Sequence, residues 1–133
     1  MDLNYGNFGK KYLLAGGGYD DAYLDTVEVF DLETLTWNAG PKLPTNLGYF
    51  DMITSPDTSS IFTFGGWDTD TPKDEVFELQ CSGDLGTCTW VLVHRLMYPR
   101  RVYTSISLPR DSISSRHQKY QLTFASSLGL NPW

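Results

Sequence analysis

Few of the side chains that do chemistry in enzymes occur in this chain of 133 residues. Its two histidines, His94 and His117, do not have the spacing of metal ligands. No serine lies in the nucleophile-elbow pattern of a hydrolase. We therefore expect no catalytic residue, no metal and no cofactor, and the chain is predicted not to be an enzyme.

Basic residues are scarce as well. Ten lysines and arginines face sixteen acidic residues, which gives a net charge of −6 and a pI near 4.6. The one basic cluster, His94-Arg95 with Arg100-Arg101, is interpreted first as solvated loop charge. Nucleic acids and anionic membranes both require clustered lysine and arginine, so neither is an expected partner.

Long apolar runs are also missing. None reaches the length of a membrane span, and residues 1–6 lack the basic and apolar parts of a signal peptide. We expect either a protein outside the secretory route or a chain that begins downstream of its natural start. A content of 41% hydrophobic and 14% aromatic residues is typical of a β-rich globular unit.

The chain does contain an internal sequence repeat with two copies. Residues 12–18 and 61–66 are short apolar runs that end in glycines, and each leads to a second apolar run and then to a tryptophan. Gly18 and Gly66 are 48 positions apart, and Trp37 and Trp90 are 53 apart. A repeat near 50 residues, built from short runs and turn residues, predicts an array of small β-sheets.

Each copy is expected to form four short strands joined in order by turns, which is the antiparallel meander of a propeller blade. The expected strands of the second copy are 49–54, 61–64, 76–79 and 89–93. Those of the first copy are 12–15, 26–31 and 36–38, with the first strand missing or reduced to 3–5. A third copy begins with a strand at 102–108, reaches 120–124, and then departs from the pattern. The predicted fold class is all-β.

The repeat resembles the kelch-repeat β-propeller family over roughly residues 10–108. The residues that carry this resemblance are two glycine pairs, an aromatic residue after each, and the tryptophans: Gly17, Gly18, Phe30, Trp37, Gly65, Gly66, Phe77 and Trp90. The resemblance divides the chain into a first blade at 1–48, a second blade at 49–101, a partial third blade at 102–125 and a non-matching tail at 126–133. Because propellers have 4–8 blades, we expect an incomplete propeller.

The residue types suit this architecture. A glycine pair at the end of an inner strand allows positive φ angles and close backbone approach. Large aromatic faces pack one sheet on its neighbour. We therefore interpret Phe30, Phe77, Trp37 and Trp90 as core residues rather than as ligand-stacking ones.

The loops after the second and fourth strands of a meander emerge at one end of the blade, so we expect any partner to bind there. These loops are 19–25, 67–73, 39–48 and 94–101. Aromatic and acidic residues alternate in the first two, which favours a basic or arginine-bearing peptide; the alternative is an ordinary polar loop surface. The acidic residues lack the ligand spacing of a calcium loop. The candidate partner-binding residues are Tyr19, Asp20, Asp21, Tyr23, Trp67, Asp68, Asp70, Arg100 and Arg101.

The resemblance implies a non-enzymatic module that binds another protein, whose identity the sequence does not give. It also brings in an alternative from a different class. Some kelch propellers are copper-dependent sugar oxidases, and in that case the active-site residues would lie outside this chain.

Cys81 and Cys88 flank a turn-rich segment between two expected strands. Each shares a face with the apolar residues of its strand, and pairing them across the hairpin would set Leu79 opposite Trp90. A disulfide here implies an oxidising compartment and hence a secreted or extracellular protein. The alternative is two reduced thiols in the cytoplasm.

Overall fold

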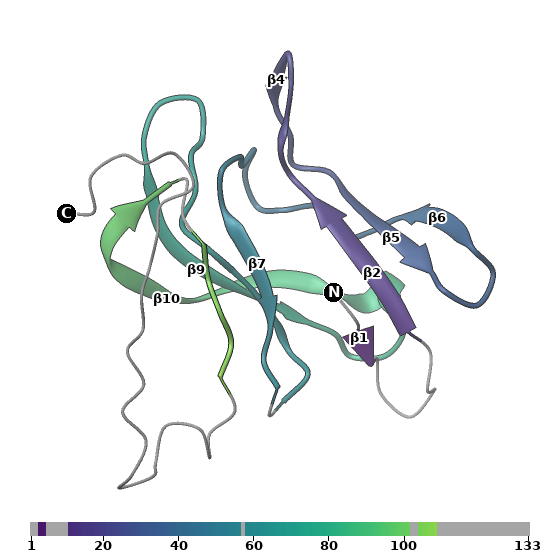
Figure 1. Ribbon diagram of the computed structural model, residues 1–133. Coiled ribbons are helices and arrows are strands. Elements are labelled where there is room, and N and C mark those ends of the chain that lie inside the picture. The colour runs from purple at the N-terminus through teal and green to yellow at the C-terminus, as the bar shows by residue number, and fades with distance from the viewer. Residues whose placement is uncertain (1–2, 5–10, 57, 102–103, 109–133) are drawn as a thin grey trace, which may run out of the picture.

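The computed structural model describes residues 3–4, 11–56, 58–101 and 104–108, and over them the chain is built from β-strands (Figure 1). The strands form two four-stranded antiparallel sheets and one small hairpin. In both large sheets each strand pairs with the next large strand along the chain. The predicted all-β class and the four-stranded meanders are therefore confirmed.

The first sheet has the strand order β1-β2-β5-β6, and its bounds are β1 (Leu3–Asn4), β2 (Lys11–Gly16), β5 (Val27–Asp31) and β6 (Thr36–Ala39). The reduced first strand is thus present. The tight turn between β5 and β6 is held by Asp31, whose carboxylate accepts hydrogen bonds from the backbone N–H groups of Glu33 (2.8 Å) and Thr34 (3.1 Å). An aspartate at the start of a turn favours this geometry.

The second sheet has the order β10-β9-β8-β7, with bounds β7 (Asp51–Thr54), β8 (Ile61–Phe64), β9 (Lys73–Gln80) and β10 (Thr89–Arg100). One expectation is wrong: residues 94–100 are not a loop but the second half of β10. They continue the ladder with register shifts, because β9 begins as early as Lys73 and offers its backbone groups to them. Arg95 reinforces this pairing, since its guanidinium contacts the carboxylate of Asp74 at 2.5 Å.

Residues 104–108, the described part of the expected strand at 102–108, form no strand. The backbone N–H of Ser105 donates to the carboxylate of Asp51 at the start of β7. A strand needs a pairing partner, and none of the described residues supplies one to this segment. The remainder of the expected third copy, including 120–124, lies outside the described residues, as does the tail at 126–133.

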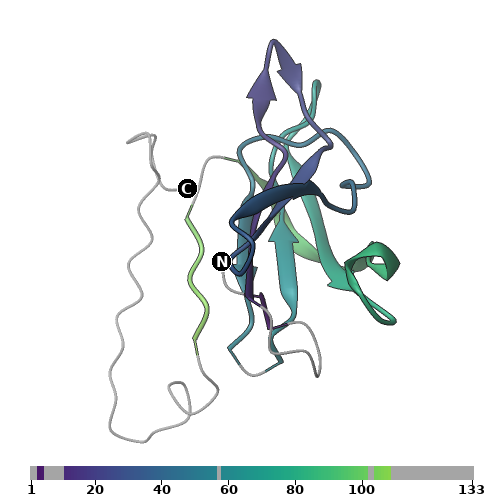
Figure 2. The ribbon, with the colours of Figure 1, turned by 90° about the vertical axis from the view of Figure 1, so that its right-hand side faces the viewer.

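The core lies between the two large sheets. In Figure 2 the two sheets overlap in the view, and the small purple hairpin projects beyond them. The buried cluster draws on the first sheet, the segment that links the sheets, and the second sheet, and consists of Val27, Leu43, Leu47, Ile61, Leu79, Cys88 and Trp90. Each sheet buries one face against the other, as blades of a propeller do.

The strand register corrects how the two copies align. Trp37 pairs with Phe30, whereas Trp90 pairs with Leu79, so Leu79 rather than Phe77 occupies the position of Phe30. The cause is one extra residue in the loop after the second glycine pair. The N–H of Gly17 donates to the carbonyl of Thr26, nine positions on, whereas the N–H of Gly65 donates to the carbonyl of Glu75, ten positions on. Both aromatics still point to the same side of their sheets, because two residues along a strand restore the same face.

The prediction that both tryptophans are core residues is right for Trp90 and wrong for Trp37. Trp90 is 8% exposed, whereas Trp37 is 54% exposed and packs in a tilted arrangement on Phe30, with ring centroids 5.0 Å apart. In each sheet the tryptophan points toward the side on which the previous blade of a propeller would lie. The second sheet has the first sheet on that side, and no described residue covers the equivalent face of the first sheet.

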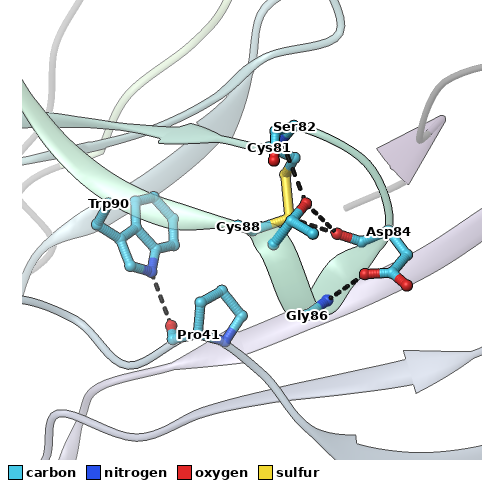
Figure 3. The surroundings of a disulfide bond; sticks show 8 residues. Pro41, Cys81, Ser82, Asp84, Gly86, Cys88 and Trp90 are labelled. Carbon is cyan, nitrogen blue, oxygen red and sulfur yellow. Dashed lines mark hydrogen bonds between the residues drawn. A yellow bond between two sulfur atoms is a disulfide. The ribbon is translucent and has the colours of Figure 1, made fainter.

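A disulfide joins Cys81 and Cys88, with Cα atoms 4.0 Å apart (Figure 3). The adjacent pairing of Leu79 with Trp90 confirms the predicted register. The enclosed loop holds the short 3-10 helix η2 (Leu85–Thr87), capped by Asp84, whose carboxylate accepts from the N–H of Gly86. Beside it, the indole N–H of Trp90 donates to the carbonyl of Pro41 at 2.9 Å, so the closed loop stands next to the segment that links the sheets.

We predict that Cys81 and Cys88 are bonded in protein from its native source. The expected stabilisation is under about 3 kcal/mol, because the closed loop is short. Mass spectrometry after alkylation without reductant should find neither cysteine modified, and alkylation after reduction should label both. Two thiols that react before reduction would contradict the bridge.

Candidate partner-binding surface

The glycine pairs turn the chain out of both sheets at the same end. Gly17 and Gly18 have φ angles of 60° and 100°, and Gly65 and Gly66 repeat them at 52° and 104°. After the first pair the chain forms a hairpin of β3 (Tyr19–Asp20) and β4 (Ala22–Tyr23). After the second pair it forms the turn at 67–72. Both loops point to the top of Figure 1.

The segment that links the sheets ties these two loops together. Its Leu47 carbonyl accepts from the N–H of Gly18 at 2.8 Å. Its Gly48 exchanges two backbone hydrogen bonds with Trp67, at 2.8 and 2.9 Å. We call the resulting area the glycine-end surface, and it consists of Tyr19, Asp20, Asp21, Tyr23, Tyr49, Trp67, Asp68, Asp70 and Arg101.

Three tyrosines form a ladder on the first half of this surface. Tyr19 meets Tyr23 edge to face at a centroid distance of 5.2 Å, and Tyr23 meets Tyr49 in the same way at 6.2 Å. Partial burial raises the pKa of Tyr23, the neighbouring tyrosines add to this effect, and the charge of Arg101 lowers it. The hydroxyl of Tyr23 is therefore a neutral hydrogen-bonding group near pH 7.

Tyr49 is a member of this surface that the sequence analysis missed, because the residue was assigned to a strand. It precedes β7, has a φ of 51°, and is 52% exposed. A positive φ at a bulky residue is uncommon and is often found at functional sites. The signal available in the sequence was its place directly after Gly48, in the segment between the blades.

The second half of the surface is occupied by cations of the chain itself. The guanidinium carbon of Arg101 lies 4.0 Å from the ring centroid of Trp67. The ammonium of Lys73 contacts the carboxylate of Asp68. This contact, together with the backbone N–H groups of Asp70 and Thr71, lowers the pKa of Asp68 to about 2, so this carboxylate is ionised throughout the neutral range.

Three carboxylates of the glycine-end surface have no ion pair with any described residue: Asp20, Asp21 and Asp70. Neighbouring acids are already paired, Asp25 with Lys42 at 3.1 Å and Asp74 with Arg95. Arg100 lies next to this surface, where its carbonyl accepts from the backbone N–H of Gly66. It ends β10, where it pairs with Lys73, and is half-buried.

An open pocket of about 320 Å³ adjoins the tyrosine ladder, between the ends of β2 and the start of β7. Its lining is mixed polar and apolar, and consists of Leu14, Gly16, Gly18, Tyr49, Phe50, Asp51 and Met52. Within the part of the chain that the structure describes, no three His, Cys, Asp or Glu side chains gather into a metal site. No described helix is long and apolar enough to cross a membrane.

Residues 11–44 match the family model of the Kelch motif. The match begins with β2, includes Gly17, Gly18 and Trp37, and ends in the segment that leads to the second sheet. No curated protein matches the chain. The motif match supports a kelch-repeat family, and the two four-stranded meanders with their repeated glycine pairs are consistent with blades of an incomplete β-propeller.

Proposed function

We propose that this chain binds another protein through the glycine-end surface, and that the partner presents a basic segment containing arginine. The kelch motif is typical of protein-interaction repeats. The finer statement about the partner rests on the chemistry of the surface. Binding of this kind, by charge and aromatic contact area, requires no cofactor.

The observation that carries the proposal is the combination of exposed aromatic area with unpaired carboxylates on the β3–β4 hairpin. Tyr19 is 63% exposed and is followed directly by Asp20 and Asp21, which have no cation beside them among the described residues. Tyrosine supplies contact area at low entropic cost, and the carboxylates supply charge complementarity to arginine or lysine. An unpaired acidic pair next to an exposed ring favours a cationic partner over an acidic or a neutral one.

The test uses a fluorescein-labelled peptide with three arginines separated by glycines, and the same peptide with glutamates. We expect the arginine peptide to bind and the glutamate peptide not to bind, with weaker binding at high salt. The double variant Asp20→Asn, Asp21→Asn should raise the Kd about tenfold, which corresponds to about 1.4 kcal/mol. Asparagine tolerates the φ of 57° at position 21, so the hairpin should keep its shape.

The matched control is Glu28→Gln with Glu33→Gln. It removes the same charge from the start of β5 and from the turn after β5, at two positions that are not part of the glycine-end surface. If both double variants weaken binding equally, net charge explains the effect and the proposed surface is wrong. Titration by fluorescence anisotropy provides the measurement.

A further inference from the structure

The aromatic face of Trp67 already carries a guanidinium, that of Arg101 from the same chain. The distance of 4.0 Å from the guanidinium carbon to the ring centroid is well within the range of a cation–π contact. Trp67 is half-buried, whereas Arg101 is exposed. The arginine therefore covers the ring from the solvent side, where a ligand from outside would also approach.

The backbone next to Arg101 is fixed, which keeps its side chain close to the ring. The N–H of Gly66 donates to the carbonyl of Arg100 at 2.6 Å, and Arg100 pairs with Lys73 in the sheet. A group tethered one residue from such an anchor has a high effective concentration at its contact. An incoming arginine must compete with it.

The two halves of the glycine-end surface differ in this respect. Both follow a glycine pair of the same conformation and both combine an aromatic residue with aspartates. In the second half, Arg101 covers Trp67 and Lys73 neutralises Asp68. In the first half, Tyr19, Asp20 and Asp21 contact no cation among the described residues.

We propose that Arg101 is an internal ligand that fills a guanidinium subsite on Trp67, and that an arginine of the partner takes this subsite when the Arg101 side chain moves away. This inference rests on the proposed function for the class of partner. It adds Trp67 as a second contact point for the partner. It also means that Arg101 weakens binding of the partner in the unaltered chain, because the two guanidinium groups compete for the same ring. Arginine is favoured over lysine because its planar guanidinium stacks on an aromatic face.

The decisive variant is Arg101→Ala, tested with the arginine peptide described above. Vacating the ring should lower the Kd about twofold to fivefold relative to the control, in keeping with the strength of exposed cation–π contacts. The matched control is Arg100→Ala, because it removes the same charge one residue earlier without uncovering Trp67. A version of the peptide with lysines should gain less than the arginine version.

A second variant makes the source of the gain explicit. In the double variant Arg101→Ala, Trp67→Leu the gain should vanish, while the backbone bonds between position 67 and Gly48 are retained. Urea unfolding of each variant establishes that the fold is intact. If Arg101→Ala binds no better than Arg100→Ala, or if the gain survives without Trp67, the inference is overturned.

The two proposals fail in different ways. Peptide binding that ignores Asp20→Asn, Asp21→Asn contradicts the proposed surface on the hairpin, whatever happens at Trp67. Binding that depends on these aspartates but not on Arg101 contradicts only the internal ligand. Binding that appears only after Arg101 is removed supports the subsite on Trp67 and contradicts the open site on the hairpin. If neither the unaltered chain nor Arg101→Ala binds the peptide, both proposals are wrong.

Discussion

Gly66→Ala is expected to lower the free energy of unfolding by about 4 kcal/mol, the sum of backbone strain and steric overlap. Gly66 has a φ of 104°, which an L side chain rarely adopts. A Cβ atom at this position would stand 2.7 Å from the Cβ of Phe50 and 2.9 Å from the carbonyl oxygen of Gly48. Backbone atoms of the linking segment have little room to retreat.

Gly18→Ala is the matched control for this prediction. Gly18 has nearly the same φ, 100°, but a Cβ atom there would meet nothing within 4 Å. Its cost should be about 1–2 kcal/mol, because only the backbone strain remains. Urea unfolding followed by near-ultraviolet circular dichroism compares the two. Equal losses would mean that close approach at Gly66 contributes nothing.

Trp90→Ala is expected to cost about 3–5 kcal/mol, the range for truncating a buried aromatic residue. The side chain lies between the two sheets and its indole N–H is bonded to the carbonyl of Pro41, so truncation leaves both a cavity and an unmatched acceptor. Trp37→Ala should cost under about 1 kcal/mol, because surface substitutions have small effects. The free energies of unfolding in urea test this difference.

The Trp37 variant serves as the control because it makes the same chemical change at the equivalent position of the other sheet. Similar losses for the two variants would show that Trp37 is covered in solution by something beyond the described residues. A loss at Trp37 that grows with protein concentration would identify that cover as a second copy of the chain.

The candidate surface was only partly predictable. The alternation of aromatic and acidic residues after each glycine pair pointed to Tyr19, Asp20 and Asp21, and the structure gathers the loops at one end as the meander requires. The sequence could not show which carboxylates lack an ion pair with another described residue. Pairing of Asp68 with Lys73, and of Arg101 with Trp67, depends on side chains brought together by the register of β9 and β10.

The sequence by itself determined the meanders and the hairpin register that brings Cys81 and Cys88 together. Alternating apolar residues, glycine pairs and dense turn signals act within a few positions of each other, and strand periodicity fixes which residues share a face. That periodicity was enough to set Leu79 opposite Trp90, and hence Cys81 near Cys88.

Only the tertiary structure decided which faces are covered. Trp37 and Trp90 occupy equivalent positions and point to the same side of their sheets, yet one is exposed and the other buried. Local sequence fixes the direction of a side chain relative to its own sheet, but burial depends on whether another sheet stands on that side. The extension of β10 has the same origin, since the early start of β9 supplied the backbone groups with which residues 94–100 pair.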